Sequence, residues 1–233
     1  MRTGVVIAVL LGSVAGVSIA GVAALVWWAG WIAAALVGIA VLIGVGALYG
    51  WVVRPRHLRW GATDDEVERE LPGDDLVPGA RSVTRAITID APAEEVWGWL
   101  VQIGYQRAGW YSYDWIDNDG VRSADRVMPE FQDLEVGDAI LMAPRMGFEV
   151  CILDPPHHLV GLLAAGPTSW FLGLFPSDDS VRLVSRWRPT VERSAAGLAT
   201  LAIVEPGTFV MERKMLRTIK QRVEASHAER VAA

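Results

Sequence analysis

A long uncharged stretch at the start of the chain constrains its fold more than any other feature. No residue between Arg2 and Arg54 carries a charge, and the run is dominated by Ala, Val, Leu, Ile and Gly. A helix needs about 20 apolar residues to cross a bilayer, so this run is long enough for two spans and too long for one. We therefore predict a two-helix transmembrane hairpin over residues 1–59, with spans from Gly4 to about Val26 and from about Ile32 to Val53.

Basic residues flank the predicted hairpin at both ends. Arg2 precedes it, and Arg54, Arg56 and Arg59 follow it. By the positive-inside rule, this places both termini and the rest of the chain in the cytoplasm, as a multi-pass protein of the cell membrane with two spans. A cleaved secretory signal ending near Ala20 is the alternative. The apolar run continues past that point without a polar break, which favours the hairpin.

The rest of the chain is acidic and lacks the common cofactor motifs. All 27 Asp and Glu residues lie beyond position 60, so nucleic acid is not an expected partner. Cys151 is the single cysteine, which excludes an intramolecular disulfide and fits a reducing compartment. We find no zinc-type spacing, phosphate loop or dinucleotide fingerprint, and therefore expect no metal and no cofactor.

The pattern after the hairpin predicts a connector and an α+β domain. Residues 60–81 form the expected juxtamembrane connector, in which Thr63 and Glu66 fit a capping box at the start of a short helix. Residues 82–233 form the expected domain, which begins with a strand from Ser82 to Asp90 and a helix led by Pro92. Short strands separated by turn residues then predict an antiparallel meander over 139–143, 148–153, 159–164, 169–175 and 181–189.

The chain ends in a predicted amphipathic helix, over residues 205–223. Residues 195–204 fit either a last strand or an extension of this helix. At about 100° per residue, one face of the helix is apolar and collects Phe209, Met215, Leu216, Ile219 and Val223.

Glu212 is the charged residue that interrupts this apolar face. A carboxylate in such a place is either paired with a cation or used in chemistry. The structural interpretation is an ion pair with Arg126 or with Arg182, Arg186 or Arg188. These last three arginines alternate along one predicted strand, which indicates a solvated face of the sheet.

Four segments together resemble one superfamily. They are Ile89–Trp97, Gly109–Trp115, Ser123–Asp138 and Phe209–Leu216. They are similar to the SRPBCC superfamily, which includes START, Bet v1-like and polyketide cyclase/dehydrase-like proteins, and to a bacterial, largely uncharacterised group within it that often carries transmembrane helices. The resemblance implies a helix-grip fold, in which a curved antiparallel sheet surrounds a long C-terminal helix with an apolar cavity between them. The segment over residues 117–120 is shorter and more polar than we expect in this group.

Candidate site residues lie in an aromatic segment from Tyr105 to Asp119, in the loop after it and on the final helix. The candidate acid/base residues are Glu212, Asp114 and Asp125, which would exchange protons with a molecule bound in the cavity. Each has a structural alternative, since the aromatic residues also suit a core and the two aspartates also suit turn caps. The candidate ligand-binding residues are Trp110, Tyr111, Tyr113, Trp115, Arg126, Glu130 and Glu212.

These features lead to one functional hypothesis and two alternatives. We expect a membrane-anchored cytoplasmic domain that binds a hydrophobic small molecule or a lipid-like ligand, with the bilayer as its partner. The first alternative is a cyclase- or dehydratase-type enzyme, and we favour binding over catalysis. The second is a protein-interaction module that uses Trp170–Phe175, which requires this run to be exposed. The identity of the ligand and of any protein partner stays open.

Overall fold

The computed structural model describes residues 16–28, 30–163, 166–190 and 194–232. The chain divides into two compact units, Met1–Pro55 and Arg56–Ala233. The first part of the predicted first span therefore lies outside the described residues.

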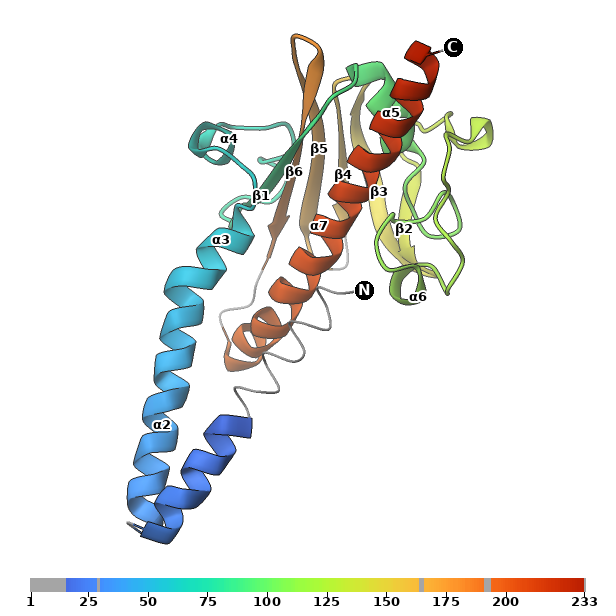
Figure 1. The fold of residues 1–233 in the computed structure, drawn as a ribbon. Coiled ribbons are helices and arrows are strands. Elements are labelled where there is room, and N and C mark those ends of the chain that lie inside the picture. Colours follow the sequence, from blue (N-terminus) through green and yellow to red (C-terminus); the bar gives the residue numbers. More distant parts are fainter. Residues whose placement is uncertain (1–15, 29, 164–165, 191–193, 233) are drawn as a thin grey trace. The chain divides into compact units, whose positions relative to one another are not determined.

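Up to Val53, the described part of the first unit consists of apolar helices. A helix over Gly16–Trp28 is followed by α2 (Trp31–Leu48), which continues through a π-helical turn, η1 (Tyr49–Val53), into α3 (Arg54–Leu58) (Figure 1). Gly30 precedes α2 with a φ of 76°, which glycine adopts without strain.

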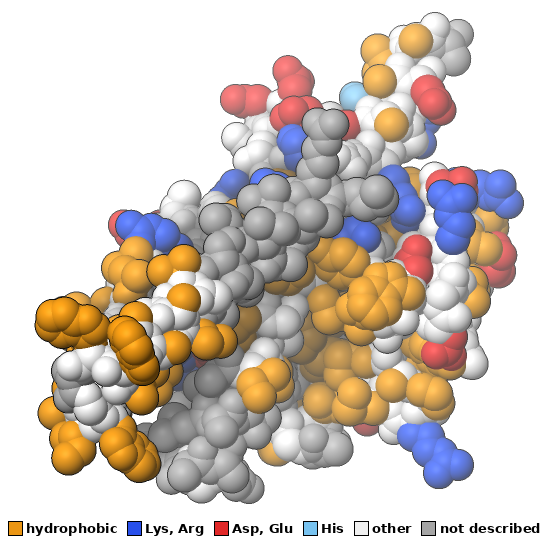
Figure 2. Space-filling view, turned by 60° about the horizontal axis from the view of Figure 1, so that its bottom comes forward, with side chains coloured by type: hydrophobic (Ala, Val, Ile, Leu, Met, Phe, Trp, Pro, Cys, Tyr) orange, Lys and Arg blue, Asp and Glu red, His pale blue; other side chains and the backbone are white. Residues whose placement is uncertain are grey.

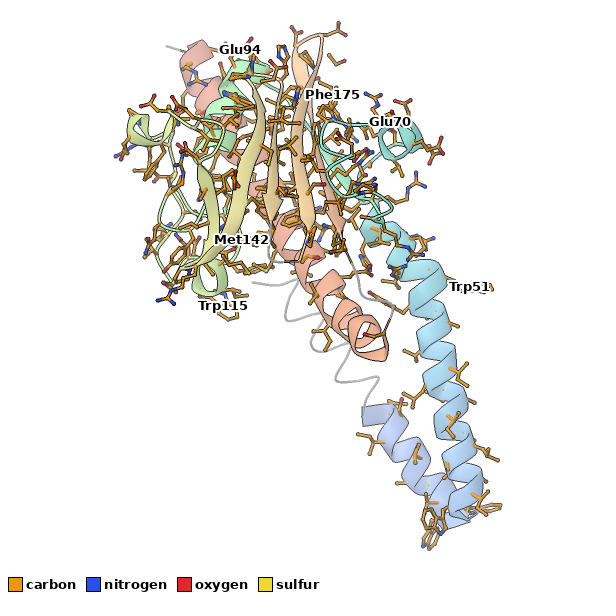
Figure 3. The ribbon with its side chains drawn as sticks, turned by 180° about the vertical axis from the view of Figure 1, so that it is seen from behind. Trp51, Glu70, Glu94, Trp115, Met142 and Phe175 are labelled. Atoms are coloured by element: carbon orange, nitrogen blue, oxygen red, sulfur yellow. The ribbon has the colours of Figure 1, made fainter. Side chains whose placement is uncertain are left out.

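One of these helices has the dimensions of a membrane span. Among the described residues, Trp31–Leu58 is long and apolar enough to cross a bilayer, with 28 residues and a mean hydropathy of 2.5, and Gly16–Trp28 is a shorter apolar helix. Trp27, Trp28 and Trp31 are exposed where the two helices meet. Hydrophobic side chains gather at this end in Figure 2, and Trp51 points away from its helix in Figure 3.

Six antiparallel strands form a curled sheet in the second unit. Their order is β1-β6-β5-β4-β3-β2, so the strands from β2 to β6 are a meander, as predicted, and β1 pairs with the last of them. Register shifts in the β2–β3 and β3–β4 pairs mark irregularities of the kind that bend a sheet. The strands are β1 (Val83–Ile89), β2 (Ala139–Ala143), β3 (Met146–Asp154), β4 (His158–Leu163), β5 (Thr168–Ser177) and β6 (Ser180–Pro189).

A long C-terminal helix, α7 (Ala195–Ala232), lies across one face of the sheet (Figure 1). It includes residues 195–204, so these extend the final helix and form no strand. The shorter helices are α4 (Asp64–Glu68), α5 (Ala93–Val101), α6 (Asp114–Asp117) and the 3-10 turn η2 (Pro129–Phe131). This arrangement confirms the predicted α+β helix-grip fold.

The main core lies between α7 and the inner face of the sheet. Met215, Leu216, Ile219 and Val223 of α7 are buried there, as their spacing predicts. They pack in one cluster with α5 and with inward residues of all six strands. Full burial of each such side chain contributes about 1.5–3 kcal/mol, so this face accounts for much of the attachment of the helix.

The outer face of the sheet is covered by the segment before β1. Leu71 of this segment packs in a second core cluster with Ala86, Val160, Phe171 and Val184. The prediction of a solvated arginine face is therefore wrong. Strand parity places those arginines on the outer face, and the segment before β1 covers them, so that Arg186 is buried and Arg182 and Arg188 are partly buried.

Each arginine on this face has a partner from the covering segment. Arg186 is 2 % exposed and pairs with Asp74 at 2.7 Å. Arg182 pairs with Glu66 at 2.7 Å, and Arg188 donates to Ser82 Oγ at 2.8 Å. Buried charges need such partners, which explains why the segment lies where it does.

The predicted capping box at the start of α4 is confirmed. Thr63 Oγ1 accepts from the Glu66 amide at 3.2 Å, and Glu66 Oε2 accepts from the Thr63 amide at 2.7 Å. The same carboxylate thus satisfies the helix terminus and Arg182. Burial raises the pKa of Glu66, but the hydrogen bonds and charge of Arg182 outweigh it and hold the pKa below its usual range.

Candidate ligand-binding pocket

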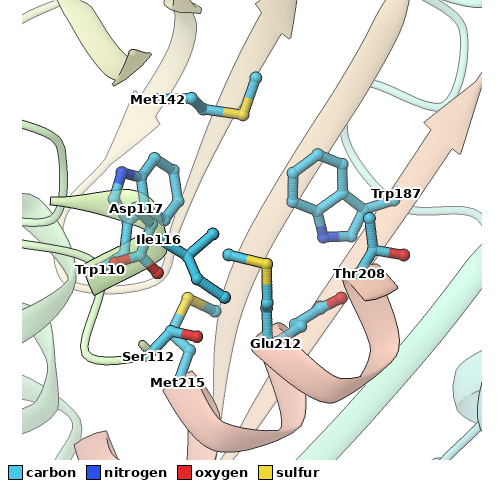
Figure 4. A pocket seen from close by; sticks show the side chains of 10 residues that line it. Trp110, Ser112, Ile116, Asp117, Met142, Trp187, Thr208, Glu212 and Met215 are labelled. Carbon is cyan, nitrogen blue, oxygen red and sulfur yellow. The ribbon is translucent and has the colours of Figure 1, made fainter. Parts of the chain in front are cut away.

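A pocket of about 250 Å³ opens between α7, the sheet and the aromatic segment (Figure 4). Its walls come from residues far apart in the sequence, which the fold brings together. α6 supplies Ile116 and Asp117, β2 supplies Met142 and β6 supplies Trp187. The remaining lining residues are Trp110, Ser112, Thr208, Met211, Glu212 and Met215.

Aromatic rings build the sheet side of this pocket. Trp170 lies at the centre of the group, with ring centroids 5.4 Å from Trp110, 5.4 Å from Phe148 and 5.3 Å from Trp187. Its indole nitrogen donates to Ser185 Oγ at 3.1 Å, which satisfies its polar atom inside the core. Of these rings, Trp110 and Trp187 line the pocket and give it an apolar wall.

Glu212 lines the pocket and is paired with a cation. Its Oε2 accepts from Arg85 of β1, and the two side chains are 5 % and 2 % exposed. Arg85 also donates through Nε to the His57 carbonyl at 3.0 Å and lies over the Phe209 ring. The predicted ion pair is thus present, with Arg85 in place of the four arginines that the sequence suggested. Glu212 Oε1 has no hydrogen-bond partner within the described residues.

Asp117 is a second carboxylate in the pocket, and sequence reasoning missed it as a site residue. Neither of its oxygens meets a donor with hydrogen-bond geometry in the described part of the chain. Burial, together with the negative charge of Asp114, raises the pKa of the Asp117 carboxyl. The Ser112 hydroxyl and the amides of Tyr113 and Asp117 lie close enough to offset part of this rise.

The predicted ligand-binding residues divide between the pocket and other environments. Trp110 and Glu212 line the pocket. Tyr111 is buried in the core, where its hydroxyl accepts from Gln102 at 2.7 Å. The ring of Tyr113 lies 4.0 Å from Lys214 Nζ. Trp115 is 76 % exposed and points outward from α6 in Figure 3.

The charged candidates of the loop region lie outside the pocket lining. Asp114 accepts from Ser123 Oγ at 2.5 Å, which fits its interpretation as a residue that fixes the loop. Asp125, Arg126 and Glu130 are exposed. Of the three predicted acid/base residues, Glu212 alone faces the pocket, and it has a cation partner. No three His, Cys, Asp or Glu side chains come together to hold a metal ion in the described ranges.

Gln102 and Arg222 hold the aromatic segment in place, and no sequence pattern pointed to them. The Gln102 amide donates to Tyr111 Oη and, at 3.1 Å, to the Arg126 carbonyl, while its oxygen accepts from the Met128 amide at 2.8 Å. Arg222 of α7 donates to the Ala124 carbonyl and lies over the Tyr111 ring. These contacts fix the loop that carries the Trp110 side of the pocket.

Comparison with solved structures returned proteins of similar architecture. The Polyketide_cyc-like protein Cgl2372 from Corynebacterium glutamicum is 15 % identical, covering 64 % of this chain and 95 % of its own, with a TM-score of 0.43. Protein CV1439 from Chromobacterium violaceum is 15 % identical over 62 % of this chain and 98 % of its own, at 0.43. CalU16 from Micromonospora echinospora is 20 % identical over 68 % and 94 %, at 0.35.

Comparison at the sequence level gave no relatives. No protein-family model matches the chain, and no curated protein matches it. The structure itself shows the fold, which is the predicted helix-grip architecture of a curled six-stranded antiparallel sheet around a long C-terminal helix.

Proposed function

We propose that this protein is a membrane-anchored domain that binds a hydrophobic small molecule or a lipid-like compound beneath its last helix. The observation that carries the proposal is the pocket of about 250 Å³, walled mainly by Trp, Met and Ile side chains. Concave apolar sites with a few polar groups are the usual form of small-molecule sites.

The volume limits the size of the ligand. About eight molecules of liquid water occupy this volume, so it suits a ligand, or a ligand part, on the order of ten non-hydrogen atoms. A larger lipid would place its remaining chain outside the pocket. The ligand is therefore a compact apolar molecule or one end of a longer one.

Anchoring to the bilayer is the second part of the proposal. It is supported by the span-length helix Trp31–Leu58 and by the basic residues Arg54, Arg56 and Arg59, which favour a cytoplasmic location for the folded unit. Apolar compounds concentrate in the bilayer, so a tethered pocket meets its ligand at high local concentration.

A pair of variants on α7 tests the binding proposal. Met211→Trp places a large ring in the pocket, whereas Val210→Trp adds the same ring at an exposed neighbour that does not line it. We expect an apolar compound to co-purify with the wild-type chain and with Val210→Trp, and to be lost from Met211→Trp. Mass spectrometry of organic extracts provides the measurement. An extract in which both variants match the wild type contradicts the assignment of the pocket.

A second candidate function is proton-transfer catalysis of the cyclase or dehydratase type. Asp117 favours it, because a carboxylate with a raised pKa and no cation partner suits a general acid or base. If the chain is an enzyme, Asp117→Asn will retain a compound of different mass from the one that the wild type retains. An identical compound in both identifies a binding protein.

The protein-interaction alternative loses its basis. It required Trp170–Phe175 to be exposed, whereas this run belongs to β5 and pairs with β4 on one side and β6 on the other. Its residues from Trp170 to Leu174 are buried.

A further inference from the structure

The first turns of α7 differ in character from the rest of the helix. Thr200 is the one polar side chain between Ala195 and Val204, and no residue in this run is charged. A helix that is apolar on all sides is normally covered by protein or by lipid. Figures 1 and 3 nevertheless show this end of α7 extending past the strands of the sheet, and Ile203 and Val204 are 77 % and 49 % exposed. Residues 195–204, the apolar end of α7, therefore need a further apolar partner.

The exposed face of α7 changes from apolar to basic along its length. Four residues that are spaced seven, four and three apart share this face: Ile203, Val210, Lys214 and Arg217. The first two are aliphatic and exposed, and the last two are basic. A bilayer offers the same order of environments, since its acyl chains lie beneath a layer of headgroups, many of them anionic. The exposed face thus matches the change in polarity at a membrane surface.

Contacts within the second unit place the apolar end of α7 near the point where the chain leaves its span-length helix. Trp31–Leu58 leads into this unit, in which the ring of His57 lies 5.4 Å from the ring of Phe209 on α7. The His57 carbonyl also accepts from Arg85 Nε at 3.0 Å, which fixes this joint to β1. Val204 precedes Phe209 by about 8 Å along the helix. A bilayer that holds Trp31–Leu58 therefore has its surface close to the apolar end of α7.

We propose that residues 195–204 of α7 insert into the membrane interface and form a second contact between the folded unit and the lipid bilayer. Ten helical residues are about 15 Å long, half the thickness of the hydrocarbon core, so this end lies in the interface and does not cross. The flanking charged residues Arg193 and Glu205 mark its limits. The inference rests on the anchoring part of the proposed function, and it adds a contact that lies outside the predicted hairpin.

This contact also brings the pocket to the membrane surface. Thr208 and Met211 line the pocket and follow Val204 by one and two helical turns. An apolar ligand that is dissolved in the bilayer then reaches the pocket over a short path through water.

Fluorescence quenching in vesicles tests the insertion. Single cysteines in a full-length Cys151→Ala chain carry a nitrobenzoxadiazole label, in vesicles of about three parts phosphatidylcholine to one part phosphatidylglycerol. Ile203→Cys reports on the apolar end of α7. Val231→Cys is its matched control, because Val231 is 73 % exposed on the same helix, about 42 Å further along. Leu42→Cys reports on the span-length helix, where Leu42 is 72 % exposed in α2.

We expect a nitroxide on the lipid acyl chain to separate these three positions. Helices in the interface lie about 5–10 Å into the boundary of headgroups and chains, so quenching at Ile203→Cys should be within about twofold of that at Leu42→Cys. Quenching at Val231→Cys should be at least about fivefold weaker. Iodide in the aqueous phase should act in the opposite sense and quench Val231→Cys most strongly.

The outcomes separate the insertion from the anchoring. If the lipid nitroxide quenches Leu42→Cys while iodide alone quenches Ile203→Cys, the insertion is overturned and the anchoring stands. An Ile203→Cys label that neither quencher reaches is covered by protein, such as a second copy of the chain, which also overturns the inference. Equal lipid quenching at Ile203→Cys and Val231→Cys contradicts a contact made by one end of the helix. If Leu42→Cys is not quenched by the lipid nitroxide, the anchoring fails, and the inference fails with it.

Discussion

The ion pair between Arg85 and Glu212 joins the first strand to the last helix across 127 residues of sequence. Both side chains are buried, so neither charge is screened by water. Taking two charges out of water offsets most of their attraction, and such a pair adds little net stability. Its effect is on specificity, because any packing of α7 that separates the two leaves a buried charge alone.

A double-mutant cycle measures this role. Arg85→Met leaves the Glu212 carboxylate buried without its cation, and we expect it to lower the free energy of unfolding by about 3–5 kcal/mol. Arg85→Met combined with Glu212→Leu removes both charges and should recover most of that loss. Thermal or denaturant unfolding of the full chain in detergent provides the measurement. If Arg85→Met alone lowers the free energy of unfolding by less than about 1 kcal/mol, water reaches the ion pair and screens it.

Strand parity and helix periodicity together contained the information for this pair. Arg85 shares its face of β1 with Val83, Ile87 and Ile89, and it is the charged residue on that face, as Glu212 is on the apolar face of α7. Each of these two buried faces carries one charged residue, and the two charges are opposite in sign. The pattern therefore predicts that they form an ion pair. Asp117 offered no such signal, since it ends a four-residue helix within an irregular segment, where no periodicity tells which way a side chain points.

At the scale of elements, the regular segments followed their patterns. The predicted strand over 139–143 coincides with β2, and the other strands differ from prediction by a few residues at their ends. Alternation and turn residues are local signals, which explains this success. The aromatic segment from Tyr105 to Asp119 is held instead by side-chain contacts, to the nearby Gln102 and to Arg222 of the distant helix α7, which no local pattern encodes.

The covering segment before β1 shows the same limit. Strand parity correctly placed Arg182, Arg186 and Arg188 on one face of the sheet. Which segment covers that face depends on tertiary contacts, which strand parity does not reveal. The segment holds their acidic partners, Glu66 and Asp74, more than a hundred residues earlier in the chain. The five acidic residues between positions 64 and 70 are equally typical of a segment exposed to solvent, so they did not indicate that this segment covers the sheet.

The pairing of Glu66 with Arg182 predicts a pH dependence. Because the folded-state pKa of Glu66 is lowered, its stabilising contribution is present above the usual pKa near 4.5 and is lost as the pH falls through the folded-state value. Glu66→Gln keeps a capping residue but removes the charge, so we expect it to lower stability at pH 7 and to weaken the loss below pH 4.5.

Two further substitutions calibrate the Glu66 effect. Glu66→Ala also removes the N3 side chain of the capping box, so we expect it to be less stable than Glu66→Gln. Glu68→Gln changes an exposed acid of the same helix and should leave the pH profile as it is. Unfolding midpoints of each full-length variant, measured from pH 7 to pH 3.5, provide the comparison. Parallel profiles for Glu66→Gln and the wild type would show that another group titrates.

At the scale of the whole molecule, two units of opposite character share one chain. The described helices of the first unit expose large hydrophobic side chains along their length, while the second unit has a buried apolar core and carries all the acidic residues. Exposure of this kind is stable in a bilayer and not in water. The pocket belongs wholly to the second unit.

The proposed topology places the two ends of the first unit on the inner side of the membrane, with the turn between the helices outside. Cys151 is the native thiol and lies in the second unit. In a chain with Cys151→Ala, an impermeant maleimide added to intact cells should label Trp28→Cys, at the turn, and leave Ala232→Cys unlabelled until the cells are lysed. Labelling of Ala232→Cys in intact cells would place the folded unit outside, and the basic residues after Val53 would then not determine its orientation.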